Sequence, residues 1–308
     1  MILSASRRTD IPCHYGEWFL NRLQAGYVLV RNPMNHSQLK RIPLSPDIVD
    51  CIVFWTKDAG NFLQRVDTIS NMNYQYYFQF TVTPYDKKIE KGLRSKGEIV
   101  ETFRALSRRI GKNRVLWRYD PILLGGEITL KYHKEQFLRL CKTLSPYTES
   151  VTISFVDDYA KQSGVFWRAP QGGEIDELAA FIGKTAKEFG LTPKACCERM
   201  NLTKYDIFPA SCIDKSVIEA LCRCELRLSR DKNQRPGCGC VESVDIGAYN
   251  TCPNGCVYCY ANRSAQSSVR NFSKHDPAAL LLLGAPALGE SVVQLQAKSN
   301  RLLQTRLF

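Results

Sequence analysis

Residues 49–58 read VDCIVFWTKD, and this stretch decides the fold class. Most of its first seven residues are β-branched or aromatic, which predicts a buried strand over 49–55. The strand ends directly before the polar group Thr56, Lys57 and Asp58. A second β-rich run, YQYYFQFTV, predicts the next strand over 74–82.

The same order extends in both directions over the first two thirds of the chain, where β-rich runs alternate with longer helical stretches. Further strands are predicted over 2–6, 114–117, 151–156 and 193–197. Helices are predicted over 15–25, 97–110, 130–144 and 175–189. Such alternation is typical of parallel βα units.

Length and composition limit the architecture further. The chain has 308 residues, of which 44% are hydrophobic and 23% charged, and this ordinary globular composition excludes long disorder and fibrous structure. We predict an α/β fold: a parallel βα barrel of the TIM type, complete or partial, with units in 1–195. A cysteine-rich C-terminal part, 196–308, is expected to complete it through a strand at 244–247.

Charged side chains recur at the carboxyl ends of the predicted strands, where active sites of βα barrels are built. Taken singly, each could be a solvated loop charge, but the pattern repeats in four strands. These residues are Arg7, Arg8, Asp10, Lys57, Asp58, Arg118, Asp120 and Asp157. We expect six of them to line the mouth of a site and to bind substrate or cofactor: Arg7, Arg8, Asp10, Lys57, Arg118 and Asp120.

The chain has 13 cysteines, an odd number that excludes complete disulfide pairing. The first residues lack the apolar core of a signal peptide, and the longest apolar stretch, 278–288, is too short to span a bilayer. We therefore expect a cytoplasmic protein without membrane association, in which clustered thiols serve metal or redox chemistry. Ten of the 13 lie between 196 and 259.

The densest group is CPNGCVYC, residues 252–259, with the spacing Cys-x3-Cys-x2-Cys. Cys252, Cys256 and Cys259 can hold three corners of a four-iron cluster, which leaves the fourth iron open to a small molecule. A zinc site is the alternative, with Cys238 or Cys240 as the fourth ligand.

The remaining thiols of this region suggest a second site. Cys238 and Cys240 lie on one turn, and Cys212 and Cys197 (or Cys196) precede them at the ends of other units. Four such ligands suit a second iron–sulfur cluster or a structural zinc, and free thiols are the alternative.

The net charge of +12 is unevenly distributed, since 86–118 holds 11 Lys and Arg against 4 Asp and Glu. Arg104, Arg108 and Arg109 fall on one face of a predicted helix, which could attract phosphates. Tyr85 and Tyr119 could then stack on bases, so nucleic acid is a candidate substrate. The alternative is a solvated basic helix on the outside of the barrel.

The cysteine spacing, with Tyr258 before the third cysteine, resembles the radical S-adenosylmethionine superfamily. The string GCVYCY at 255–260 is similar to the spore photoproduct lyase branch. The whole chain resembles the bacterial family catalogued as domain of unknown function 1848. The segments that carry this wider resemblance are 6–12, 52–57, 118–121, 231–235 and 245–252.

The resemblance implies that Cys252, Cys256 and Cys259 ligate a [4Fe-4S] cluster whose open iron binds S-adenosylmethionine. It also implies cofactor contacts from Tyr258 and Asn250, a 5′-deoxyadenosyl radical as the reactive species, and an electron donor such as a flavodoxin or ferredoxin. In that superfamily the cysteine loop follows the first barrel strand. Its late position here implies a circular permutation, in which the strand at 244–247 lies beside the strand at 2–6.

Two functions from other classes remain open at this point. One is a zinc-stabilised nucleic-acid-binding protein, and the other is a cluster-bearing redox sensor or electron carrier.

Overall fold

The computed structural model describes residues 1–308 except 36, 157–166, 199, 236 and 303–308. Its centre is a sheet in which all neighbouring strands run parallel, in the order β10-β1-β4-β5-β6-β7-β8-β9. These strands are β1 (Ile2–Ala5), β4 (Cys51–Thr56), β5 (Tyr76–Thr81), β6 (Val115–Ile122), β7 (Ser150–Phe155), β8 (Thr192–Ala195), β9 (Phe208–Pro209) and β10 (Val244–Asp245). The predicted α/β class with parallel βα units is confirmed.

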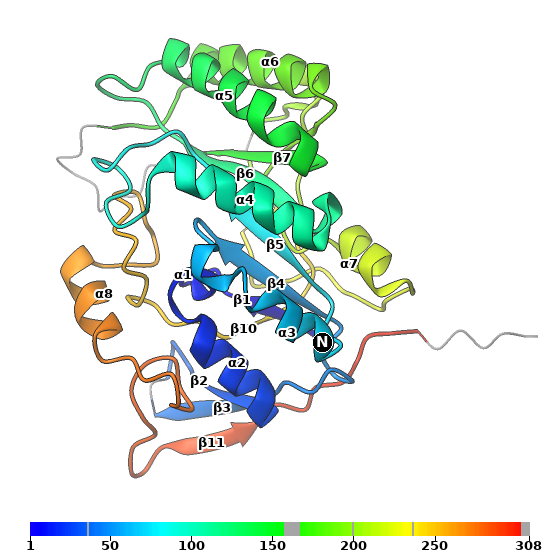
Figure 1. Cartoon of the computed structure of the whole chain (residues 1–308), viewed down its shortest axis with the longest axis vertical. Coiled ribbons are helices and arrows are strands. Elements are labelled where there is room, and N and C mark those ends of the chain that lie inside the picture. Colours follow the sequence, from blue (N-terminus) through cyan, green and yellow to red (C-terminus); the bar gives the residue numbers. More distant parts are fainter. Residues whose placement is uncertain (36, 157–166, 199, 236, 303–308) are drawn as a thin grey trace, which may run out of the picture.

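Helices follow the strands and cover the sheet (Figure 1). The helices between strands are α1 (Ile11–His14), α2 (Gly16–Ala25), α3 (Val66–Asn71), α4 (Lys96–Ile110), α5 (Leu130–Leu144), α6 (Gly172–Glu188) and α7 (Lys215–Cys222), and α8 (Ala265–Phe272) follows the cysteine loop. The strand order begins at β10 and ends at β9. Within the described residues these two edge strands do not pair with each other, so the hydrogen-bonded sheet is open.

Strands β1 and β10 lie side by side although they come from opposite ends of the chain. Leu3 pairs with Val244 and Ser4 pairs with Asp245, in parallel register. The predicted adjacency of 2–6 and 244–247 is therefore confirmed. The carboxylate of Asp245 joins the two strand ends, because it accepts hydrogen bonds from the Ser6 hydroxyl (2.5 Å) and from the backbone N–H of Arg7 (2.8 Å).

A second, smaller sheet lies outside the predicted pattern. It contains β2 (Tyr27–Arg31), β3 (Gln38–Pro43) and β11 (Ser291–Gln294), in the order β11-β3-β2, and lies at the bottom of Figure 1. Strands β2 and β3 are antiparallel, so this part of 1–195 departs from βα alternation. Because β11 and β10 both belong to 196–308, the C-terminal part contributes to both sheets.

One strand extends further than predicted. Strand β6 does not end at Trp117 but continues through Arg118 and Asp120 to Ile122, with a register shift between Tyr119 and Ile122. Proline lacks the N–H that a ladder needs, so Pro121 favours an earlier end to the strand, but it is accommodated at this irregularity. Two of the expected site residues therefore lie within a strand.

The helix boundaries follow local chemistry more closely. Helix α5 spans the predicted residues, and α2 ends where predicted because Gly26 adopts the left-handed conformation (φ 74°) that glycine tolerates best. Across the described residues, every helix is too short or too polar to cross a lipid bilayer.

Candidate functional site

A cavity of about 490 Å³ lies at the carboxyl ends of the parallel strands. Side chains that follow β1, β4, β8 and β10, or that belong to β6 and β7, form its wall. All six charged residues expected at the mouth line it: Arg7, Arg8, Asp10, Lys57, Arg118 and Asp120. The six charged residues predicted at the strand ends therefore lie together around one cavity.

Two further charged residues from the same pattern lie elsewhere. Asp58 is not part of the cavity wall; it forms a bidentate ion pair with Arg94, whose Nε and Nη2 donate to the carboxylate at 2.6 Å. Asp157 lies outside the described residues.

The cysteines of both groups line the same cavity. They are Cys252, Cys256 and Cys259 of the loop, together with Cys196, Cys197, Cys212, Cys238 and Cys240. Tyr258 also lines it, whereas Asn250 does not. Asn250 instead shapes the loop: it has a left-handed backbone (φ 57°), and its side-chain oxygen accepts a 2.6 Å hydrogen bond from the backbone N–H of Arg263.

The cysteine loop is seated on residues 89–92 through backbone hydrogen bonds. The N–H of Val257 donates to the carbonyl of Ile89 (3.0 Å), and the N–H of Gly92 donates to the carbonyl of Asn254 (2.8 Å). A side chain at position 92 would collide with this loop, because a Cβ there would lie 2.6 Å from the carbonyl oxygen of Pro253. The close approach thus requires glycine.

Replacing Gly92 by Ala is expected to lower the free energy of unfolding by about 1–3 kcal/mol, since neither backbone can yield without losing a hydrogen bond. Gly97→Ala is the matched control. Gly97 lies in the first turn of α4, and a Cβ added there would meet no atom within 4 Å, so this change is expected to be neutral or slightly stabilising. Urea unfolding of both variants measures the difference. Equal stabilities would show that the loop does not rest on position 92.

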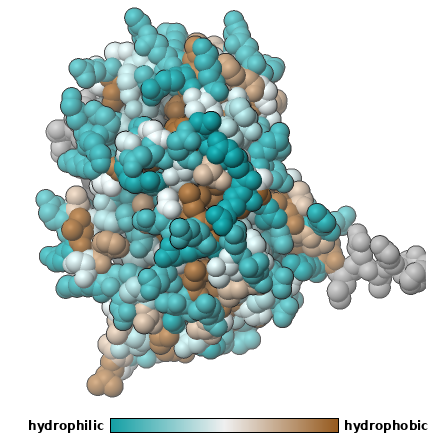
Figure 2. Space-filling view, viewed as in Figure 1, coloured by the Kyte–Doolittle hydropathy of each residue, from teal (hydrophilic) through white to brown (hydrophobic). Residues whose placement is uncertain are grey.

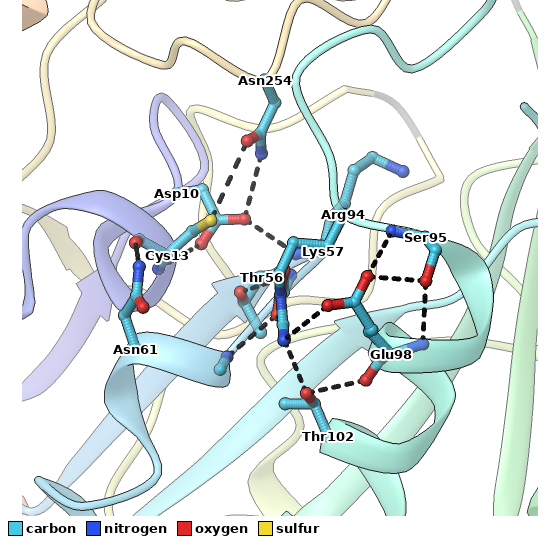
Figure 3. Close-up of polar contacts among 12 residues, drawn as sticks. Asp10, Cys13, Thr56, Lys57, Asn61, Arg94, Ser95, Glu98, Thr102 and Asn254 are labelled. Atoms are coloured by element: carbon cyan, nitrogen blue, oxygen red, sulfur yellow. Dashed lines mark hydrogen bonds and ion pairs between the residues drawn. The ribbon is translucent and has the colours of Figure 1, made fainter. Parts of the chain in front are cut away.

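Asp10 connects three elements at the edge of the cavity, as Figure 3 shows. One carboxylate oxygen accepts from the N–H of Cys13 (3.0 Å) and thereby caps α1. The other accepts from the N–H of Lys57 (2.8 Å) and from the side-chain amide of Asn254 (3.3 Å). Burial raises the pKa of Asp10. This carboxylate therefore holds the ends of β1 and β4 against the cysteine loop.

Glu90 is the buried centre of a second set of contacts. Its carboxylate pairs with Lys57 (2.9 Å) and Lys96, and accepts from the hydroxyls of Thr83 (2.8 Å) and Tyr258. Burial alone would raise the pKa of Glu90, but the two ammonium groups outweigh it and lower the pKa to about 2. The same partner keeps the pKa of Lys57 above its usual value despite burial. Glu90 therefore holds the ammonium group of Lys57 and the hydroxyl of Tyr258 in place near Cys256.

Two guanidinium groups flank Trp55 on the cavity wall. The Cζ atoms of Arg7 and Arg118 each lie 5.4 Å from the centre of the indole ring, within the range of cation–π attraction. Arg118 also pairs with Asp120 and donates to the sulfur of Cys212 at 2.7 Å. The cavity thus combines cationic, aromatic and thiol groups.

Sequence reasoning missed Glu90, Asn254 and Trp55. Glu90 is one of four acidic residues in the run with 11 basic residues, and this excess of positive charge was a weak signal for a buried ion pair. Trp55 is the last residue of the strand predicted over 49–55, and this position at a carboxyl strand end could have marked it as a residue of the cavity wall. Asn254 lies between two candidate ligands, but its contact with Asp10 crosses 244 positions of sequence and carries no local signal.

The three loop thiols suit a metal group that needs three thiolates and leaves one position open. Burial raises the pKa of each of them, and that of Cys252 to about 12. Such thiols give up their protons when a metal binds. Within the part of the chain that is described, no group of His, Cys, Asp or Glu side chains is already arranged around an ion position.

The basic face of α4 is engaged by neighbouring residues. Arg104 and Arg108 lie over the ring of Tyr147, at 5.1 and 5.2 Å, and Arg109 pairs with Asp67. The expectation that Tyr85 and Tyr119 stack on bases is wrong, because both side chains are fully buried in the core. The surface on this side of the molecule is largely hydrophilic (Figure 2).

Comparison with known proteins yields one family. A family model described as "Domain of unknown function (DUF1848)" matches residues 2–261, which is most of the chain. No curated protein and no solved structure matches. The match covers β1 to β10 and the whole cysteine loop.

Proposed function

The chain belongs to the DUF1848 family, a family of unknown function, and we propose that it is an iron–sulfur enzyme of the radical S-adenosylmethionine type. Cys252, Cys256 and Cys259 would hold a four-iron cluster with one open iron. An external donor, such as a flavodoxin or ferredoxin, would supply electrons. The substrate would occupy the 490 Å³ cavity that these thiols line.

One observation carries this proposal. Three thiols on a single loop share a cavity with six charged side chains that come from the carboxyl ends of different parallel strands. This is the face where βα proteins place their active sites. The pairing of β10 with β1 also fits the permuted strand order that the resemblance requires.

The chain's own residues would bind and orient the reactants. When bound, the cluster held by Cys252, Cys256 and Cys259 would supply one electron for cleavage of the S-adenosylmethionine sulfonium, with methionine as the leaving group. Arg7, Arg8 and Arg118 line the cavity and would give it positive charge that favours substrates with carboxylate or phosphate groups. Lys57 is held in place by Glu90 and would keep positive charge next to the cysteine loop.

Cofactor cleavage tests the reaction. The chain is purified without oxygen, reduced with dithionite and incubated with S-adenosylmethionine. We expect 5′-deoxyadenosine and methionine in equal amounts, with neither formed by Cys256→Ala. A protein that holds about four iron atoms per chain but cleaves no cofactor would favour an electron carrier or redox sensor.

Zinc is the alternative occupant of the same thiols, because thiolates bind both metals. The companion idea of nucleic-acid binding has less support. The arginines expected to contact phosphate are engaged with Tyr147 and Asp67, and the expected stacking rings are buried. The proposal therefore leaves the substrate class open.

A further inference from the structure

Five thiols outside the cysteine loop lie together on one part of the cavity wall. The sulfurs of Cys196 and Cys212 are 3.3 Å apart. Electrostatic interactions link Cys196 to Cys197, Cys212 to Cys240, and Cys238 to both Cys240 and Cys197. We call these five residues the thiol ring. Three of them are buried and two are partly buried.

The backbone is shaped to bring these thiols together from three segments. Cys196 and Cys197 follow β8, and the left-handed conformation of Cys197 (φ 55°) turns the chain so that adjacent cysteines both reach the ring. Gly239 allows its turn to approach Ser211, because a Cβ there would lie 2.4 Å from the serine hydroxyl. The N–H of Ile213 donates to the sulfur of Cys240 (3.4 Å), which joins the second and third segments.

Two cations lie beside the thiol ring. Arg118 donates to the sulfur of Cys212 at 2.7 Å. The Nη2 atom of Arg7 is buried and has no hydrogen-bond partner among the described residues. The thiols of Cys240 and Cys212 are the foremost groups whose negative charge would favour the Arg7 cation. Asp245 lies near Arg7 and Asp120 pairs with Arg118, and thiolates bound to a metal would bring further negative charge to both cations.

We propose that the thiol ring binds a second metal centre through four thiolates, with the fifth cysteine as a neighbour. Four thiolates around Zn²⁺, or around a [4Fe-4S]²⁺ core, carry a net charge of about −2, which Arg7 and Arg118 balance. Four thiols each lose a proton to solvent as four metal–sulfur bonds form. Both metals share this chemistry, and metal analysis distinguishes them.

One sulfur–sulfur distance can be compared with that of a zinc site. Zinc–sulfur bonds are about 2.3 Å long, so sulfurs at the corners of one tetrahedron lie roughly 3.8 Å apart. The sulfurs of Cys196 and Cys212 lie 3.3 Å apart, so this pair would have to open by about half an ångström, which side-chain rotation supplies. A four-iron cluster holds its ligand sulfurs further apart and would need larger movements.

The test begins from a chain without the loop thiols, C252A/C256A/C259A, so that the loop can no longer hold a cluster. After anaerobic reconstitution with iron, sulfide and zinc, we expect about one zinc or about four iron atoms per chain. Adding Cys238→Ser and Cys240→Ser should abolish this metal. Adding Cys224→Ser, a thiol outside both groups, should leave it unchanged. A folded starting variant that retains no metal would overturn the proposal.

A second measurement needs no variant. The wild-type chain is alkylated before and after metal removal, and each cysteine is followed by mass spectrometry. Protection of Cys212, Cys238 and Cys240 that disappears with the metal is the expected result. Equal labelling in both states would overturn the proposal. Protection at Cys252, Cys256 and Cys259 is scored separately, so failure at the loop and failure at the ring are distinguishable.

Discussion

Replacing Cys256 by Ala is expected to remove the iron held at the cysteine loop, about four atoms per chain, together with all cofactor cleavage. Two thiols cannot hold three corners of the cluster. Cys256 also lies at the point where the loop bridges to Glu90, whose carboxylate is already paired with Lys57 and Lys96. Iron analysis and visible absorbance after anaerobic reconstitution measure the loss.

Cys224→Ala serves as the control, because this thiol belongs to neither cysteine group and does not line the cavity. It should keep both the iron and the absorbance of the wild-type chain. Unchanged absorbance in Cys256→Ala, with the ring thiols also replaced, would refute the ligand assignment.

Replacing Glu90 by Gln is expected to lower the free energy of unfolding by about 3–5 kcal/mol at neutral pH. The change keeps the shape of the side chain but removes the charge that compensates two lysines. The side chains of Lys57 and Lys96 are 16% and 23% exposed, so neither ammonium can be fully hydrated in place. Urea unfolding near pH 7 measures this effect.

The control and the pH dependence separate this effect from a general cost of mutation. Glu101→Gln breaks a pair with Arg104 in which Glu101 is 61% exposed, so its cost should stay below about 1 kcal/mol.

The pKa of Glu90 is lowered from 4.5 to about 2 in the folded chain. Its stabilisation is therefore present above pH 4.5 and is lost as the pH falls toward 2. Parallel stability curves for wild type and Glu90→Gln across this range would contradict the assignment.

Helices and their ends could be predicted where the local sequence pattern also matches the packing of the folded chain. Helix α5 has an apolar stripe, and α2 ends at a glycine that adopts the required left-handed conformation. The hairpin of β2 and β3 was missed, although Tyr27–Arg31 is rich in β-branched residues, because the run lies between a helix and the next parallel strand. Its third strand, β11, comes from the far end of the chain.

The cavity could be predicted in outline because strand ends converge in a parallel sheet. That rule placed Arg7, Lys57 and Arg118 correctly. It could not place Glu90 or Asn254, since their roles depend on how the loops fold over the strand ends. Asn250, expected at the cofactor, instead serves the turn that begins the loop.

The sequence could not predict that Cys196 and Cys197 both lie with the other thiols of the ring. The sequence left Cys196 and Cys197 as alternatives for one ligand. In the structure the backbone at Cys197 is left-handed, and both thiols join the ring.

Metal analysis of a chain that keeps the loop thiols but lacks Cys238 and Cys240 of the thiol ring tests the central claim most directly. The variant Cys238→Ser, Cys240→Ser is purified and reconstituted without oxygen, and iron, sulfide and zinc are counted per chain. The account predicts about four iron atoms and about four sulfides at the loop, with a brown colour that S-adenosylmethionine perturbs on reduction. A folded, colourless chain that holds about one zinc and no iron would contradict it.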